Sequence, residues 1–358
     1  MSLKLQSASK ISADRELSWD ALRIFAAFWV VATHVTGPNW YIYAVGTPQW
    51  LFVNLYGVLT RCAVPLFLMV SGAAFLRRPE PPTLSRLFRK NIAHLLTVYL
   101  VWVLLYAMDT VSLPVLFSRE GPAALLQACL KPKYHLWFLP RMIGTYLLLP
   151  ALWAIVHCKE GRYVRYLSVL FLLLYFLPRS LNTVPELQPY VKFLLQFELP
   201  LTSFFCYILL GYALSQAELR RLPTWALIAG VVLTIVAAAG WNWFQMVHTD
   251  NHGAPVYDMT ALSSCLEAGW FFLLFRRLGA RKLPRKLTAV ICELSSCTLT
   301  VYLLHVFILE RLQGRLDLSA FPLGAALGIP AVSLLIFLLC LPVAAVLRRI
   351  PRLGKWIC

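Results

Sequence analysis

Charged residues are scarce in this sequence: Asp, Glu, Lys and Arg together make up only 14% of its 358 residues. Soluble domains carry about 25% charged residues, so this chain lacks the side chains that a water-facing surface requires. Segments that alternate strictly between polar and apolar residues are lacking too, because the apolar runs are continuous. The first shortage excludes a soluble globular protein, and the second excludes a membrane β-barrel.

Paired cysteines are also lacking. The nine cysteines are scattered, they form no CxxC pair, and their spacing matches no secreted disulfide framework. We therefore expect no structural disulfide, no metal site and no permanently bound cofactor. A cleaved signal peptide is not expected either, because the first apolar stretch contains Asp20, Arg23 and His34 and no small-residue cleavage site follows it.

Long hydrophobic runs are what the sequence has instead. Hydrophobic residues make up 59% of the chain, and the mean hydropathy is +0.69. Most runs are close to the ~20 residues that a helix needs to cross the hydrocarbon of a bilayer. They predict an all-α, polytopic membrane protein of about ten transmembrane helices, over 17–37, 51–76, 91–112, 135–157, 163–178, 191–214, 223–246, 259–277, 288–309 and 322–347.

The Lys and Arg residues behind the net charge of +17 are concentrated in the segments predicted on one side of the membrane. With the N-terminus inside, the cytoplasmic segments hold 23 of the 33 Lys and Arg residues, and the outer loops hold 7. Positive charge on the inner side sets the orientation of a membrane protein. We therefore predict that both termini are cytoplasmic, and the basic excess requires no nucleic-acid partner.

The chain is interpreted as one membrane domain without an appended soluble domain. We expect a cytoplasmic tail over 1–16, a transmembrane domain over 17–347 and a basic cytoplasmic tail over 348–358. The longest connection, 113–134, contains the amphipathic run 123–130, which predicts a short helix at the outer interface.

Ionisable residues inside spans are costly and usually mark a function, and Arg23 and His34 are the most informative of them. Eleven residues at ~100° each come within ~20° of whole turns, so both side chains lie on one helix face. They are ~16 Å apart along the axis, with Arg23 near the inner side and His34 beyond the midplane. His34 can be a general base or proton relay, or a histidine hydrogen-bonded to a neighbouring carbonyl; the arginine on the same face favours the functional interpretation.

The second span places another arginine at depth. Arg61 precedes Pro65, whose ring leaves backbone groups without a helical partner. Further along, Ser71 and Gly72 are small residues that allow close helix approach. Ser71 is also a candidate nucleophile, but packing is the favoured interpretation.

These residues carry a resemblance to a known family. The R-x10-H pattern of Arg23 and His34 and the run V-P-L-F-L-M-V-S-G at 64–72 resemble the acyltransferase-3 family of membrane acyltransferases. R-L-F-R at 86–89, Y-H-L-W-F at 134–138 and the run S-C-T-L-T-V-Y-L-L-H at 296–305 are similar to further motifs of that family. The resemblance covers nearly all predicted spans.

Within the family, the chain is most similar to short, single-domain sugar O-acetyltransferases such as the enzyme that acetylates enterobacterial common antigen. The pair Ala73-Ala74 after Ser-Gly departs from the family pattern, which leaves the packing there open.

The resemblance implies an O-acyltransferase of the inner (cytoplasmic) membrane, which carries an acyl group, in the simplest case acetyl, from cytoplasmic acyl-CoA to a hydroxyl of a cell-surface or lipid-linked glycan. Arg86 and Arg89 then hold the CoA phosphates and Arg23 guides the donor arm. The positive-inside rule alone explains Arg86 and Arg89 equally well.

The same resemblance assigns roles at the outer end. His34 takes the proton of the attacking hydroxyl, and Arg61 stabilises the oxyanion. The acceptor passes His135, Trp137 and His305. The acidic residues Glu198, Glu267 and Asp20 then support the imidazole or pair with the arginines.

A polytopic glycan exporter is the alternative that the sequence leaves open. It also explains a polar seam through the membrane, and it would place Gly or Pro breaks at corresponding positions of two halves. Pro65 and Pro200 are not arranged in that way. Binding of CoA from the cytoplasmic side distinguishes an acyltransferase from an exporter.

Overall fold

The computed structural model describes residues 16–158, 162–195, 203–219, 222–248, 258–279, 283–313, 323–350 and 354. Every regular element within these ranges is a helix. The first part of the chain forms α1 (Leu17–Asn39), α2 (Pro48–Leu59), η2 (Thr60–Cys62), α3 (Ala63–Leu76), α4 (Leu84–Arg86), η3 (Leu87–Ile92), α5 (Ala93–Thr110), α6 (Leu113–Leu116), α7 (Gly121–Leu130), η4 (Tyr134–Trp137), α8 (Phe138–Leu147) and α9 (Leu149–His157). The second part forms α10 (Arg162–Phe171), η6 (Leu172–Phe176), α11 (Leu177–Leu181), η7 (Pro185–Leu187), α12 (Gln188–Leu195), α13 (Ser203–Ser215), α14 (Thr224–His248), α15 (Leu262–Gly279), α16 (Arg285–Gln313) and α17 (Gly324–Arg349).

The prediction of an all-helical, polytopic membrane protein is confirmed. Among the described residues, seven helical stretches are long and apolar enough to cross a bilayer, and an eighth is counted if η4–α8 and α9 form one span bent by 51°. Pro150 follows the bend directly and lacks the N–H that a continuous helix requires there. Helices α13 and α15 lie at the two remaining predicted spans, but α13 is short and α15 carries Glu267 and a pair of arginines.

The fifth predicted span does not end at Pro178, which is a correction. The helix continues through that residue to Leu181, and the turn before it widens into the π-helix η6. Proline clashes with the carbonyl four residues earlier and cannot bond to it, and a wider turn relieves both problems.

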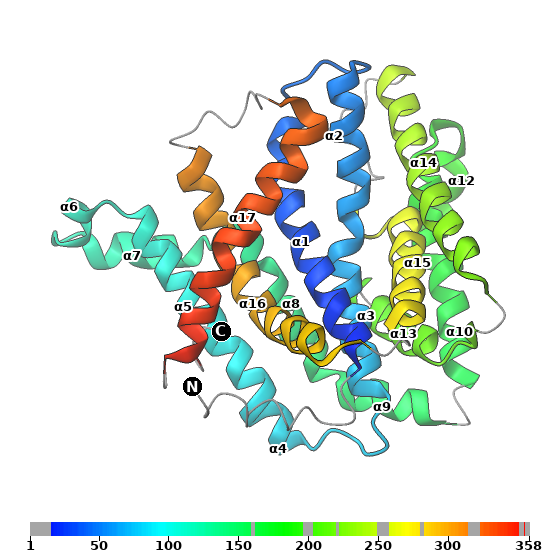
Figure 1. The fold of residues 1–358 in the computed structure, drawn as a ribbon, viewed down its shortest axis with the longest axis horizontal. Coiled ribbons are helices and arrows are strands. Elements are labelled where there is room, and N and C mark those ends of the chain that lie inside the picture. The colour runs from blue at the N-terminus through cyan, green and yellow to red at the C-terminus, as the bar shows by residue number, and fades with distance from the viewer. Residues whose placement is uncertain are drawn as a thin grey trace.

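Helix α1 lies in the centre of the bundle, where it contacts α3, α15, α16 and α17 (Figure 1). Helices α3 and α13 approach each other closely, and glycines allow it. A Cβ at Gly72 would overlap the backbone of Ile208, and one at Gly211 would overlap the backbone of Met69. The expectation that Ser71-Gly72 permits close helix approach is therefore confirmed.

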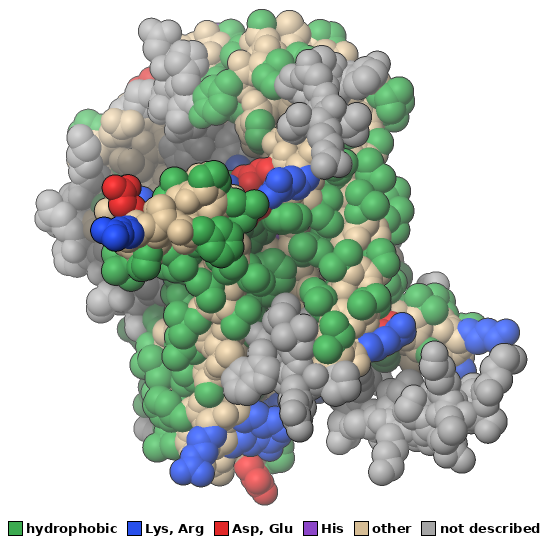
Figure 2. Space-filling model, turned by 90° about the vertical axis from the view of Figure 1, so that its left-hand side faces the viewer, with side chains coloured by type: hydrophobic (Ala, Val, Ile, Leu, Met, Phe, Trp, Pro, Cys, Tyr) green, Lys and Arg blue, Asp and Glu red, His purple; other side chains and the backbone are tan. Residues whose placement is uncertain are grey.

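The surface is largely apolar, and its lower end, called the basic end below, carries Lys and Arg. Figure 2 shows hydrophobic side chains over much of one face, Lys and Arg at its lower end, and further Lys and Arg at mid-height and on the right of this view. The start of α1, the end of α17 and α4 all lie toward the lower end, while α6 and α7 project sideways from the bundle (Figure 1). This arrangement agrees with the positive-inside orientation, in which the lower end is cytoplasmic.

Candidate active site

A cavity of about 540 Å3 lies between the helices, toward the end of α1. Its wall is formed by α1, η2, α3, η4, α8 and α16, and by the two residues Asp258 and Met259 that precede α15. Four residues that the sequence predicted for the site meet at this wall: His34, Arg61, His135 and Trp137. The other polar and aromatic residues of the wall are Thr33, Thr60, Asp258, Phe138 and Tyr302.

His34 lies in the last two turns of α1, and the sequence explains why the helix ends there. Pro38, four residues further on, has no N–H to donate to the His34 carbonyl, and α1 ends at Asn39. The helix is continuous from Leu17, so Arg23 and His34 lie on one straight element with ~16 Å of rise between them. The imidazole is thereby presented at a helix end rather than in the middle of a packed helix.

Arg61, like His34, is followed four residues later by a proline. Pro65 cannot donate to the Arg61 carbonyl, and the chain between α2 and α3 tightens into the 3-10 turn η2 at this place. The break puts Arg61 on the cavity wall. A fixed cation there can stabilise a negative charge that develops on a reacting oxygen.

Three histidines come together beside the cavity. The ring centroids of His34 and His305 are 5.0 Å apart, those of His135 and His305 are 5.3 Å apart, and those of His34 and His135 are 6.4 Å apart. His305 does not line the cavity but lies fully buried behind the other two. Within the described ranges, no three His, Cys, Asp or Glu side chains are placed so that they could hold a metal ion.

The hydrogen-bond partners of two of these rings define their tautomers. Nδ1 of His305 lies 2.6 Å from the carbonyl oxygen of Tyr302, and Nε2 of His135 lies 3.4 Å from the carbonyl oxygen of Leu303. A carbonyl oxygen only accepts, so these nitrogens carry the proton and the opposite nitrogens carry a lone pair. Nε2 of His305 and Nδ1 of His135 are buried and have no hydrogen-bond partner within the described residues. The cluster therefore offers two acceptor nitrogens to a hydroxyl or N–H donor.

Glu267 lies behind Arg61 rather than on the cavity wall. It is 1% exposed and lies next to Cys62, the residue that follows Arg61, and the Cys62 thiol donates to the Leu59 carbonyl at 3.3 Å. This position suits a residue that supports the η2 break. Glu198, the other acid predicted for this role, lies outside the described residues.

Arg23 and Asp20 stay together near the start of α1, away from the histidines. The guanidinium of Arg23 lies 3.3 Å from the Asp20 carboxylate, which also accepts a hydrogen bond of 2.6 Å from Ser295 on α16. Asp20 is 1% exposed, whereas Arg23 is 36% exposed. Asp20 thus fixes Arg23 and ties α1 to α16, and neither residue reaches the 540 Å3 cavity.

A second cavity of about 250 Å3 lies at the basic end, around the Pro-rich turn between α3 and α4. Its polar side chains are those of Arg78, Glu80, Thr83, Arg86 and Asn91. Arg89 is exposed on the π-helix η3 and does not line this cavity. Of the two arginines predicted to hold the donor phosphates, only Arg86 thus contributes to this cavity, together with Arg78, which the sequence did not single out.

Tyr302 is one of several cavity residues that the sequence did not single out. Its hydroxyl donates to the backbone carbonyl of His135, and its ring lies 5.7 Å from that of Phe138. A signal was available, because Tyr302 lies in the 296–305 motif one helical turn before His305. Thr33 and Thr60 were missed as well, but both hydroxyls donate to backbone carbonyls of their own helices.

A family model described as an acyltransferase domain matches residues 16–349, nearly the whole chain. The chain therefore belongs to this family of membrane acyltransferases. No curated protein matches it significantly, and no solved structure does so either.

Proposed function

We propose that this acyltransferase is an O-acyltransferase of the cytoplasmic (inner) membrane. It transfers an acyl group, in the simplest case acetyl, from cytoplasmic acyl-CoA to a hydroxyl of a cell-surface or lipid-linked glycan, as the sugar O-acetyltransferases that the sequence resembles do. The observation that carries the proposal is that His34 and Arg61 meet at one cavity in a chain of this family. One supplies a base and the other a fixed cation, which are the two groups that acyl transfer to a hydroxyl needs.

The donor enters from the basic end. Arg86 and Arg78 line a cavity there, and guanidinium groups bind phosphates well because they present several N–H donors in one plane. Arg89 adds positive charge at the rim. The arm of the donor passes Arg23, and the ~16 Å rise from Arg23 to His34 is comparable with the length of that arm.

The chemical step joins the two substrates at the 540 Å3 cavity. The hydroxyl oxygen attacks the thioester carbonyl as a nitrogen of His34 takes the hydroxyl proton. Arg61 stabilises the oxyanion that forms on the carbonyl oxygen. The C–S bond then breaks, the CoA thiolate takes the proton from the imidazolium, and the ester and free CoA leave.

The transfer is direct, without an acyl-enzyme. Among the described residues of the cavity wall there is no Ser or Cys, and the Thr33 and Thr60 hydroxyls are donated to backbone carbonyls. Ser71 donates to the Phe67 carbonyl and is not on the wall, which favours the packing role. Direct transfer predicts that [14C]acetyl-CoA alone leaves no covalent label on the purified protein.

The proposal is tested with membranes from cells that express the protein and from cells that lack it. [14C]Acetyl-CoA is added to inside-out vesicles, and the label in the glycan and glycolipid fraction is measured together with the affinity of the purified protein for CoA. We expect labelled, alkali-releasable acetyl groups only when the protein is present, and saturable CoA binding. A protein that exports glycan into the vesicles without any acetyl incorporation and without CoA binding would be an exporter and would refute the proposal.

A further inference from the structure

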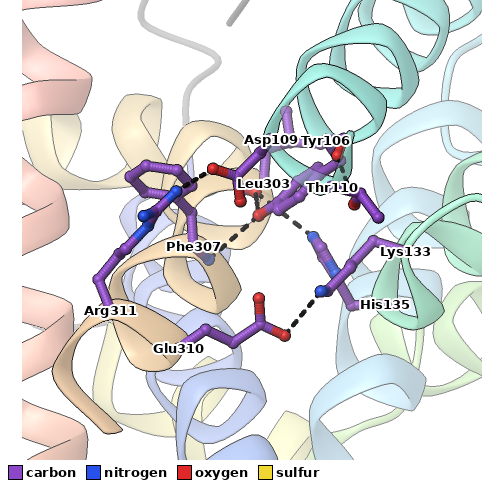
Figure 3. Close-up of polar contacts among 9 residues, drawn as sticks. All are labelled: Tyr106, Asp109, Thr110, Lys133, His135, Leu303, Phe307, Glu310 and Arg311. Carbon is purple, nitrogen blue, oxygen red and sulfur yellow. Dashed lines mark hydrogen bonds and ion pairs between the residues drawn. The ribbon is translucent and has the colours of Figure 1, made fainter. Parts of the chain in front are cut away.

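Helices α5 and α16 are joined on the outer side of the histidine cluster by a tyrosine. Figure 3 shows the Tyr106 hydroxyl between the Leu303 carbonyl and the Phe307 backbone N–H. The hydroxyl donates to the carbonyl oxygen at 2.8 Å and accepts from the N–H at 3.2 Å. Tyr106 is 4% exposed, so water does not compete for these contacts.

The two backbone groups that Tyr106 contacts are partners in one helical turn. In a regular α-helix, the N–H of residue 307 bonds to the carbonyl of residue 303. The Tyr106 hydroxyl therefore contacts both groups of one turn, while α16 stays α-helical from Arg285 to Gln313. A carbonyl oxygen has two lone pairs, so the Leu303 oxygen can accept from side chains on its flank as well as within the helix.

His135 uses this carbonyl. Its Nε2 lies 3.4 Å from the Leu303 oxygen, the same atom to which Tyr106 donates (Figure 3). The neighbouring Tyr302 hydroxyl donates to the His135 backbone carbonyl, so α16 holds His135 at its ring and at its backbone. With Nε2 protonated, Nδ1 remains as an acceptor that is buried, unpartnered among the described residues and part of a side chain on the cavity wall.

We propose that Tyr106 is a positioning residue for the acceptor site: its hydroxyl holds the Leu303 carbonyl where it fixes His135 in the Nε2–H tautomer, and Nδ1 of His135 then accepts a hydrogen bond from a hydroxyl of the incoming glycan. The role of the glycan rests on the proposed function. The fixed tautomer is a property of the protein alone and can be tested without any substrate.

Two ion pairs lie further out on the same interface and provide a rival explanation for its geometry. Lys133 is 2.8 Å from Glu310, and Arg311 pairs with Asp109 (Figure 3). The side chains of both pairs are between 26% and 56% exposed, and ion pairs in contact with solvent contribute little. The buried Tyr106 hydroxyl is therefore the contact that sets the position of the Leu303 carbonyl.

The first arm of the test is the tautomer of His135. The protein is labelled with 15N-histidine and studied by NMR in lipid nanodiscs, and the signals of His135 are identified by their loss in His135→Gln. In the wild-type protein we expect a protonated Nε2 and an unprotonated Nδ1. In Tyr106→Phe we expect a mixture of tautomers, while the controls Tyr99→Phe, on the same helix, and Asp109→Asn keep the wild-type signals.

The second arm is the transfer of label from [14C]acetyl-CoA to the glycan fraction of vesicles. Tyr106→Phe should lower the rate about tenfold, the scale of one buried hydrogen bond, with an unchanged KM for acetyl-CoA. A wild-type His135 protonated at Nδ1, or His135 signals that Tyr106→Phe leaves unchanged, overturns the inference. Absence of label with the wild-type protein refutes the proposed function instead, and the NMR arm still decides the role of Tyr106.

Discussion

The two polar regions of this protein, the histidine cavity and the basic inner end, are built in opposite ways. At the cavity, His135 and His305 are buried and held by hydrogen bonds: the Tyr302 hydroxyl on α16 donates to the His135 carbonyl, and the Tyr302 carbonyl accepts from His305 one turn along the same helix. At the inner end, Arg86 and Arg89 are exposed and lie on one short helical segment. Burial and cross-helix bonding are typical of groups that must be pre-organised for chemistry, whereas exposed arginines are typical of binding and topology.

This difference matches two separate roles that we propose: the catalytic base lies at the cavity, and the donor-binding arginines lie at the inner end. A base must be held in one geometry, because catalysis depends on its position in the transition state. A phosphate-binding arginine can be mobile, because it contributes to affinity before the chemical step. We therefore expect the cavity to control the maximal rate and the inner end to control the KM for the donor.

The largest effect is expected for His34→Gln, which keeps a donor, an acceptor and a similar size but cannot act as a base. The rate of acetyl transfer should fall by about 10²- to 10⁴-fold, the usual contribution of general-base catalysis. CoA affinity should stay unchanged, because the phosphate site that we propose lies at the other end of α1. Titration of CoA and steady-state transfer assays measure both quantities.

The matched control is His248→Gln, at the exposed end of α14, which should behave like the wild-type protein. If His34→Gln also lost CoA binding, the cavity and the inner end would not have the separate roles in chemistry and donor binding that we propose.

An intermediate effect is expected where α3 and α13 meet. In Gly72→Ala the new methyl group would overlap the Ile208 carbonyl, and backbone cannot move aside as a flexible side chain can. Overpacking of this kind costs about 1–3 kcal/mol, or roughly 5- to 150-fold in the folded-to-unfolded ratio. The unfolding midpoint in detergent should fall, and with it the yield of monodisperse protein.

Gly144→Ala on α8 is the control, because its Cβ would meet nothing within 4 Å. This substitution should leave the midpoint unchanged or raise it slightly. Equal midpoints for the two variants would show that the α3–α13 approach does not support the cavity.

The smallest effect is expected for Arg86→Ala combined with Arg89→Ala. Loss of two exposed phosphate contacts should raise the KM for acetyl-CoA roughly three- to tenfold, since solvent screens such contacts. Lysine at both positions should recover part of the affinity, because an ammonium group lacks the planar arrangement of donors. An unchanged KM in the folded alanine variant would leave both arginines as topology signals only.

Much of the architecture could be predicted from the sequence, because each span is a local property. Most apolar runs predicted their spans to within a few residues, although the third helical stretch begins at Leu84 and not at 91, and α13 begins at Ser203 and not at 191. Pro65 already indicated a break beside Arg61, whereas Pro38, near the end of α1, was not singled out. The continuation of the helix through Pro178 could not be foreseen, because a π-turn accommodates that proline and depends on packing around it.

The site was predictable only as a set of residue types. Motif positions identified His34, Arg61, His135 and Trp137, which the structure brings to one cavity, and His305, which lies behind it. The hydrogen-bond partners of these residues could not be predicted from the sequence. That Tyr106 on α5 contacts the backbone of α16 depends on the relative depth of two helices, which no periodicity within either helix reveals.

The central claim is that His34 performs the chemistry and the inner arginines only hold the donor. The most direct measurement is the rate of acetyl transfer at saturating acetyl-CoA, made side by side for His34→Gln and for the double alanine variant of Arg86 and Arg89. We expect the double variant to return to nearly the wild-type rate and His34→Gln to remain at least about 10²-fold below it. A His34→Gln protein that reaches nearly the wild-type rate would contradict the account.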